Sequence, residues 1–186
     1  ATTIQISTNG KNSYEVSSLA FNENLNRDIH HYDLSKTNWH NYVIGVVHGL
    51  NKLRPNKIKG FKADISSKIP VGAGLSSSAA LTCGIARGLN ELFQLNFSKN
   101  ELMFVAQKAE HDFAGAPCGI MDQYTIIHGQ KNHLLLSLIH YAIILFVGRE
   151  KNLGKFRHHI AAQMHGIFRL CHNPRPKFNA SYHHAT

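Results

Sequence analysis

The sequence predicts a domain that combines strands and helices, and three of its segments show why. Residues 61–69 alternate apolar and polar side chains, which is the period of a half-buried strand. Residues 81–92 then carry apolar side chains at helical spacing, and residues 39–50 form the apolar stripe of an amphipathic helix. Strands and helices of this kind bury their apolar faces by packing on one another, so we expect one core of mixed type.

The first strands are expected at the N-terminus. Residues 4–6 and 14–16 alternate in the same way on either side of a loop that contains Asn9-Gly10. Because Asn-Gly is typical of tight turns between strands, this pattern predicts a β-hairpin. Residues 20–36 are polar, and we expect them to form a connecting loop.

The first helix is expected to begin after Thr37 or Asn38, which are both residue types that cap helices well. Pro55 ends it, because proline cannot continue a helix. Trp39 lies on the apolar stripe, so we interpret its side chain as part of the core rather than as a stacking platform for a ligand.

A further helix begins at Ser98, where Glu101 three residues later completes a capping box. Its apolar stripe continues to Phe113. Glu110 lies just beside that stripe, where its carboxylate could point along the surface into a neighbouring cleft. An isolated glutamate is most often solvated or ion-paired, and that alternative stays open at this point.

Composition limits the class of protein. The 186 residues suffice for one domain with a core, and 43% apolar residues is ordinary for a globular protein. The longest apolar run, residues 141–147, is too short to span a membrane, and the N-terminus shows no signal-type segment. Cys83, Cys118 and Cys171 are odd in number and widely separated, which disfavours a disulfide framework or a zinc site and favours a cytoplasmic location.

The basic charge is unevenly distributed along the chain, whose formal net charge is +9. Residues 1–122 hold 12 Lys and Arg against 10 Asp and Glu, whereas residues 123–186 hold 8 Lys and Arg against Glu150 alone. A basic tail favours acidic partners, so a weak nucleic-acid-binding module is one alternative function. Its signal is electrostatic only, because the tail contains no recognisable RNA-binding motif.

A turn rich in glycine and serine joins the predicted strand at residues 61–69 to the helix at residues 81–92. Backbone N–H groups and the positive end of a helix dipole gather in such a turn, so its natural ligand is an anion, usually phosphate. It is not the G-x-x-x-x-G-K-[ST] loop, since no lysine precedes the serines, and Ser77 replaces the third glycine of G-x-G-x-x-G. The structural alternative is a serine-capped helix after a glycine turn.

A second turn, residues 114–123, consists mostly of small residues and delivers Asp122 into largely apolar surroundings. An aspartate is costly to bury there unless it is hydrogen-bonded or paired with a cation, which makes Asp122 a candidate catalytic group. The alternative is a carboxylate that caps the next helix.

Together these stretches resemble the galactokinases of the GHMP small-molecule kinase superfamily. The resemblance rests on Pro70 with Gly72–Leu81, on Ala109-Glu110-His111 and on Pro117–Gln123. The glycine–serine stretch is similar to the phosphate-binding motif of the superfamily, whereas Cys118–Gln123 is similar to galactokinases in particular. The similarity is clear from Trp39 to Leu136 and extends more loosely back to Ala1.

The resemblance implies an α+β fold of the GHMP kinase N-terminal-domain type, with helices packed on a mixed sheet. It also implies a reaction, in which ATP phosphorylates the anomeric hydroxyl of α-D-galactose to give galactose 1-phosphate and ADP. Asp122 would accept the proton of that hydroxyl, and Ser78 and Glu110 would ligate Mg²⁺. The residues implied to bind the ATP phosphates are Gly72, Ala73, Gly74, Leu75, Ser76, Ser77 and Ser78.

Some motifs of the galactokinases are not found in this sequence. These enzymes carry an N-terminal G-R-x-N-L-I-G-E-H-x-D-Y-type motif, which supplies sugar contacts and an arginine, and a C-terminal glycine-rich motif. We therefore expect residues 1–136 to be a partial GHMP kinase N-terminal domain, and the 186-residue chain to be inactive as written. We expect residues 137–186 to be an atypical basic, histidine-rich tail that is either disordered or frameshifted.

A non-catalytic sugar and ATP sensor on the galactokinase fold is the other alternative function. The presence of both Asp122 and Ser78 favours catalysis over this alternative. The expected partners are therefore galactose and ATP, with neither a membrane nor a specific nucleic acid among them.

Overall fold

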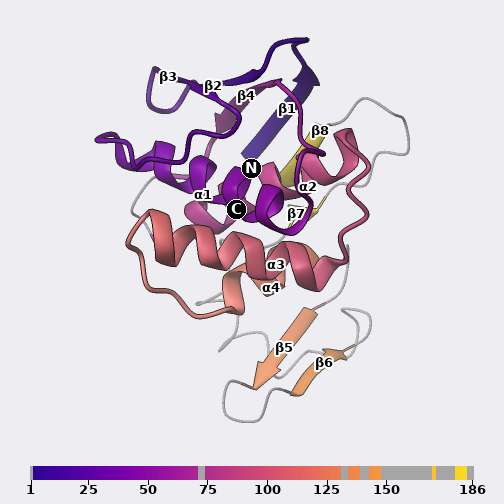
Figure 1. The fold of residues 1–186 in the computed structure, drawn as a ribbon. Coiled ribbons are helices and arrows are strands. Elements are labelled where there is room, and N and C mark those ends of the chain that lie inside the picture. Colours follow the sequence, from indigo (N-terminus) through magenta and orange to yellow (C-terminus); the bar gives the residue numbers. More distant parts are fainter. Residues whose placement is uncertain are drawn as a thin grey trace.

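A six-stranded sheet organises the fold in the computed structural model, which describes residues 2–70, 74–130, 134–138, 143–147, 169–170 and 179–183 (Figure 1). The strands are β1 (Thr2–Thr8), β2 (Ser13–Ser18), β3 (Glu23–Asp28), β4 (Phe61–Ser67), β7 (Arg169–Leu170) and β8 (Asn179–His183). Their order in the sheet is β3-β2-β4-β1-β8-β7. The sheet is mixed, because β4 runs antiparallel to β1 and parallel to β2.

The helices gather on one side of this sheet (Figure 1). They are α1 (Asn38–Leu53), α2 (Ser77–Leu92), α3 (Lys99–Lys108), the π-helical turn η1 (Ala109–Phe113) and α4 (Met121–His128). Helix α2 packs on β1, and α3 packs on both α1 and α2. Along β4, Ala63 and Ile65 are buried beneath the helices while Lys62 and Asp64 are exposed. The α+β fold with helices on a mixed sheet is thus confirmed.

Strands β1 and β2 do not form the predicted hairpin, because β4 lies between them. Asn9 fastens the connecting loop to the start of β4. Its side-chain amide donates hydrogen bonds to the carbonyl oxygens of Phe61 at 3.1 Å and Ser13 at 3.0 Å. Gly60 is required at this crossing, since a Cβ there would overlap the carbonyl of Lys11. The hairpin prediction is therefore wrong, although the chain does reverse at Asn9.

Part of the segment predicted as a loop, residues 20–36, is a strand. β3 pairs antiparallel with β2 at the edge of the sheet. Leu25 is the one residue of β3 that is buried. A strand with a single buried side chain shows no alternation of apolar and polar residues, so the sequence pattern gave no sign of it.

The helices follow the predictions closely. Thr37 is the residue that precedes α1, and Trp39 in its first turn is buried as predicted. Helix α3 begins after Ser98, whose hydroxyl accepts a hydrogen bond from the N–H of Glu101 while the Glu101 carboxylate accepts one from the N–H of Ser98. The predicted capping box is therefore confirmed. Within the described residues, no helix is both long enough and apolar enough to cross a bilayer.

A second sheet pairs β5 (Leu134–Leu138) with β6 (Ile143–Val147) in antiparallel fashion. Strands β6, β7 and β8 fall within residues 137–186, for which we expected a disordered or frameshifted tail. Of these, β8 extends the main sheet beside β1. The remaining residues of this segment, apart from the end of β5, lie outside the described part of the chain, so the division at Leu136 stays a prediction.

The close packing of α1 on η1 gives a stability prediction. A Cβ on Gly45 would lie 2.8 Å from the Cα of Ala109, a backbone atom that moves only if η1 moves. We expect Gly45→Ala to lower the free energy of unfolding by about 1–3 kcal/mol, although alanine has the better helix propensity. Urea unfolding followed by circular dichroism measures this loss.

Gly49→Ala is the matched control on the same helix. Its Cβ would meet a methyl group of Val105 at 3.1 Å, and a side-chain methyl can shift more easily than backbone. This variant should therefore keep or slightly raise the stability. Equal losses in the two variants would contradict a special role for the contact at Gly45.

Candidate active site

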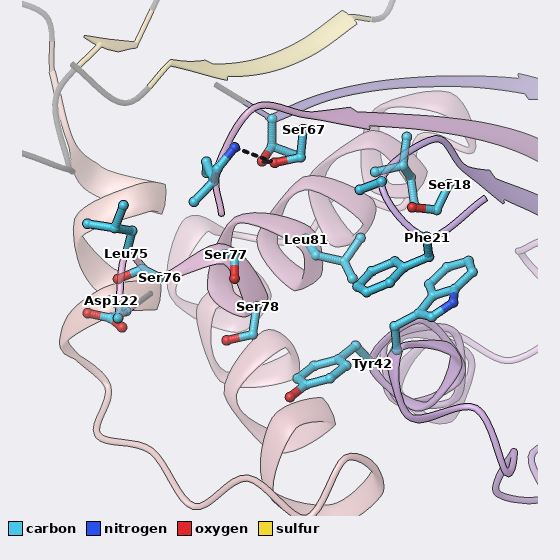
Figure 2. A pocket seen from close by; sticks show the side chains of 16 residues that line it. Ser18, Phe21, Tyr42, Ser67, Leu75, Ser76, Ser77, Ser78, Leu81 and Asp122 are labelled. Carbon is cyan, nitrogen blue, oxygen red and sulfur yellow. Dashed lines mark hydrogen bonds between the residues drawn. The ribbon is translucent and has the colours of Figure 1, made fainter. Parts of the chain in front are cut away.

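A pocket of about 410 Å³ opens where β2 and β4 end and β1 begins (Figure 2). Its size is typical of sites for small molecules. The start of α1, the turn before α2 and the start of α4 complete its wall. The lining residues are Thr2, Ser18, Ala20, Phe21, Trp39, Tyr42, Ile65, Ser67, Ile69, Gly74, Leu75, Ser76, Ser77, Ser78, Leu81 and Asp122.

One end of the pocket is aromatic. The ring of Phe21 stacks on Trp39 with centroids 5.6 Å apart and planes 6° from parallel. The indole N–H of Trp39 donates a hydrogen bond to the Glu23 carboxylate at 2.7 Å, which fixes the orientation of the ring. Tyr42 lies nearly one turn further along α1 and faces the same space (Figure 2). Trp39 is thus a core residue, as predicted, and it also forms part of the pocket wall.

The glycine–serine turn lies at the middle of the pocket. Gly74 and Ser76 both have left-handed backbone conformations, with φ of +68° and +56°. Such a conformation is uncommon for a serine, and strain of this kind is found most often at functional sites. The turn leads into α2, whose first residues line the pocket. The free backbone N–H groups of the first helical turn are therefore exposed at the end of the helix that borders the pocket.

The N-terminus of α2 has no side-chain cap among the described residues. Ser76 stands at the N-cap position, but its hydroxyl makes no capping hydrogen bond, and the first turn of α2 holds no acidic residue. The alternative of a helix capped by the Ser76 side chain is therefore not observed. An uncapped N-terminus can bind an anion, because its N–H groups and the helix dipole both favour negative charge. Of the residues implied to bind phosphate, Gly74, Leu75, Ser76, Ser77 and Ser78 line the pocket, whereas Gly72 and Ala73 lie outside the described residues.

Glu110 is buried, with 2% of its surface exposed, and not solvated at the surface as an isolated glutamate usually is. The π-helical turn η1 changes the direction of its side chain relative to the stripe of α3. Its Oε1 atom accepts a hydrogen bond from the Gln123 amide at 2.7 Å and lies 3.2 Å from the Thr82 hydroxyl. Oε2 has no hydrogen bond with the described residues.

The segment between η1 and α4 is fastened by His111. Nε2 of this histidine lies 2.9 Å from the backbone nitrogen of Cys118 and 2.7 Å from its carbonyl oxygen. An unprotonated Nε2 can accept from the N–H group, and a protonated Nε2 can donate to the carbonyl. The imidazole can therefore hold this segment in either protonation state.

Asp122 lies in the first turn of α4 and points into the pocket. The N-cap of α4 is Ile120, so Asp122 does not cap the helix, and its carboxylate makes no hydrogen bond with a described residue. It is half-buried and lies beside Leu75 and Ser76, at the end of the pocket far from Phe21 (Figure 2). Its surroundings are thus more polar than the sequence pattern indicated.

The two implied metal ligands are close in the fold but do not by themselves form a metal site. The hydroxyl of Thr82 lies 3.1 Å from the carbonyl of Ser78, so one turn of α2 connects Ser78 to Glu110. Burial, and next the Glu110 carboxylate, raise the pKa of Tyr42. Glu110 itself is buried and is not among the residues that line the pocket. No group of three or more His, Cys, Asp or Glu that could hold a metal ion occurs in the part of the chain that the structure describes. The Mg²⁺ site therefore stays a prediction.

Two residues of the site had no functional signal in the sequence, and a third, Gln123, had one only as the last residue of the stretch that is similar to galactokinases. Phe21 is an isolated aromatic residue in a polar segment, and Tyr42 lies on the apolar stripe of α1, where it reads as core. Gln123 is 1% exposed and faces the core next to Asp122. Because consecutive residues of a helix lie about 100° apart, helical spacing indicates that the side chain after Asp122 points in a different direction.

The chain is similar to known kinases. Residues 41–130 match the family model described as the GHMP kinases N terminal domain. The galactokinase of Thermotoga maritima is 41% identical over 114 residues, which cover 61% of this chain and 32% of that enzyme. The galactokinase of Pyrococcus furiosus is 42% identical over 97 residues, covering 52% of this chain and 27% of that enzyme. The chain thus spans well under half the length of these curated relatives.

Solved structures agree with the sequence comparison. The crystal structure of Lactococcus lactis galactokinase complexed with galactose superposes with a TM-score of 0.73 and 29% identity, over 79% of this chain and 39% of that one. The mevalonate kinase of Methanococcus jannaschii has the same fold, with a TM-score of 0.58 and 24% identity over 68% of this chain and 41% of that one. Residues 41–130 therefore match the N-terminal domain of the GHMP kinases, and the chain that contains them is similar in sequence and fold to the galactokinases.

Proposed function

We propose that this chain is part of a sugar kinase that transfers the γ-phosphoryl group of ATP to the anomeric hydroxyl of α-D-galactose. The observation that carries the proposal is the composition of one pocket, which joins an aromatic end, an uncapped helix N-terminus and the carboxylate of Asp122. Galactose is proposed because the homologues are galactokinases and the Lactococcus lactis enzyme was crystallised with galactose. Cytoplasmic location is part of the same proposal.

The two ends of the pocket differ chemically, and this difference favours one direction for a bound nucleotide. Its adenine ring would lie at the end formed by Phe21, Trp39 and Tyr42, since aromatic side chains bind flat π-systems by stacking. Its phosphates would then reach the N-terminus of α2, where the backbone N–H groups of Ser77 and Ser78 can donate hydrogen bonds. This direction brings the γ-phosphate to the end of the pocket where Asp122 lies (Figure 2).

Asp122 is the proposed general base. Its carboxylate would accept the proton of the anomeric hydroxyl while the sugar oxygen forms a bond to the γ-phosphorus. The bond from that phosphorus to the oxygen bridging the β- and γ-phosphates breaks, and ADP leaves with the electron pair. Because phosphoryl transfer depends mainly on positioning and charge stabilisation, one base and one anion-binding turn supply much of what the reaction needs.

Mg²⁺ is the metal that the family implies, and the donors present fit it. Mg²⁺ prefers oxygen ligands and keeps several waters, so the Ser78 hydroxyl and Oε2 of Glu110 would be a sufficient protein contribution. When bound, it would neutralise negative charge on the β- and γ-phosphates. The residues of this chain would hold it between α2 and η1.

Nucleotide binding is the direct test of the pocket. Trp39 is the single tryptophan of the chain and lies in the pocket wall, so its emission reports on the site without a label. We expect ATP with Mg²⁺ to change Trp39 emission in a saturable way and galactose to be phosphorylated only where the missing family motifs are supplied. A saturable signal from single-stranded RNA that ATP does not displace would favour the nucleic-acid alternative instead.

Substitution of the proposed general base distinguishes a catalytic kinase from a non-catalytic sensor. In a form of the protein that phosphorylates galactose, Asp122→Asn should lower kcat by about 10²- to 10⁴-fold, because the amide keeps the shape but cannot accept the proton. The Kd for ATP from Trp39 emission should stay unchanged. Asp112→Asn is the control, since Asp112 is exposed on η1 and does not line the pocket. A near-normal kcat for Asp122→Asn would remove this residue from the role of base.

The metal ligands are tested by magnesium dependence. Ser78→Ala and Glu110→Gln should each raise the Mg²⁺ concentration that gives half of the maximal effect on ATP affinity, because each variant removes one oxygen ligand. Titration of Mg²⁺ at fixed ATP, followed by Trp39 emission, measures this concentration. Glu91→Gln, an exposed substitution near the far end of α2, should leave it unchanged. Unaltered magnesium dependence in both ligand variants would refute the assignment.

A further inference from the structure

Gln123 places a polar side chain deep in the core directly beside Asp122. It is 1% exposed, and its amide nitrogen lies 2.7 Å from Oε1 of Glu110 and 3.4 Å from the sulfur of Cys118. Its amide oxygen is buried and has no hydrogen-bond partner among the described residues. The side chain is therefore held through its nitrogen alone.

The orientation of this amide follows from the charge of its partner. A carboxylate can only accept hydrogen bonds, so the NH₂ group and not the oxygen of Gln123 must face Glu110. Hydrogen bonds to a charged acceptor are stronger than neutral ones. The unpartnered oxygen lowers the stability of the fold, and an apolar side chain of the same size would avoid that loss. The polar side chain is therefore poorly explained by packing alone.

The other neighbour of Glu110 does not secure it equally well. The hydroxyl of Thr82 has one proton, and three acceptors lie within reach of it. These are the carbonyl of Ser78 at 3.1 Å, the carbonyl of Ala79 at 3.3 Å and Oε1 of Glu110 at 3.2 Å. When the proton points to a helical carbonyl, as is common for threonine inside a helix, Gln123 is the remaining donor to Glu110.

We infer that Gln123 is the positioning residue for the metal ligand: it holds Oε1 of Glu110 so that Oε2 is presented towards the Mg²⁺ of the bound nucleotide. The inference rests on the proposed function, because it presupposes that Glu110 ligates the metal. Groups that orient a metal ligand through its second atom commonly determine metal affinity. Since Gln123 and Asp122 are consecutive residues of α4, the same helix fixes the base on one side and the metal ligand on the other.

The test measures ATP affinity with and without Mg²⁺ by isothermal titration calorimetry on the full chain. Gln123→Met keeps the length of the side chain and removes the donor. We expect the Mg²⁺ affinity of the ATP-bound protein to fall about 10- to 100-fold, while the metal-free affinity for ATP stays unchanged. Thr125→Val is the matched control, because Thr125 is another buried polar residue of α4 and its hydroxyl donates to the carbonyl of Met121 within the same helix.

A double variant shows whether Gln123 acts through Glu110. In a Glu110→Gln background, Gln123→Met should have no further effect on magnesium dependence, since effects on one shared ligand are not additive. Gln123→Asn, whose amide is too short to reach Glu110, should repeat the effect of Gln123→Met and serves if the methionine variant does not fold. A loss of metal-free ATP affinity would mean that Gln123 only supports the fold, and would overturn the inference.

Failure of the inference can be told apart from failure of the proposed function. If Mg²⁺ raises the ATP affinity of the unchanged chain and of the Gln123→Met variant by the same factor, the inference about Gln123 is wrong and the proposed function stands. If Mg²⁺ does not alter ATP affinity in the unchanged chain, the metal site itself is wrong and the inference fails with it.

Discussion

The position of β4 between β1 and β2 determines where the pocket lies. Because β4 is parallel to β2 and antiparallel to β1, the ends of β2 and β4 and the beginning of β1 meet at one edge of the sheet. Ligand sites commonly form beyond the carboxyl ends of strands, where the turn into a helix exposes backbone N–H groups. The glycine–serine turn leaves β4 at that edge, so the strand order delivers it to the pocket.

The site divides its tasks among separate elements of the fold. Helix α1 and the segment before β3 supply the aromatic wall, α2 supplies the anion-binding terminus, and α4 supplies Asp122. A second layer of polar side chains, centred on Glu110, lies behind this wall and connects α2, η1 and α4 through hydrogen bonds. The surface that would meet the nucleotide is thus supported by buried contacts between the same helices that form it.

Local patterns predicted local structure well and failed where a distant segment decided the outcome. The stripe of α1, the capping box at Ser98 and the turn before α2 depend on residues within a few positions of one another, and each was recognised. The supposed hairpin failed because its true partner strand, β4, comes much later in the chain. Glu110 was placed beside the surface because an α-helical spacing was assumed, and the π-helical turn could not be seen in the pattern. The motifs located the site, but the packing behind it was visible only in three dimensions.

The different directions of Asp122 and Gln123 restrict insertions and deletions in the first turn of α4. One residue added there would turn the side chains that follow by about 100°, so it would carry Asp122 away from the pocket and Gln123 away from Glu110. His111 holds the segment before α4 at Cys118 through backbone atoms, which every residue type provides. Within the loop that leads to this segment, Gly115 has a left-handed backbone conformation with φ of +64°, so a larger residue there would be strained. The loop therefore tolerates a change of residue least at Gly115.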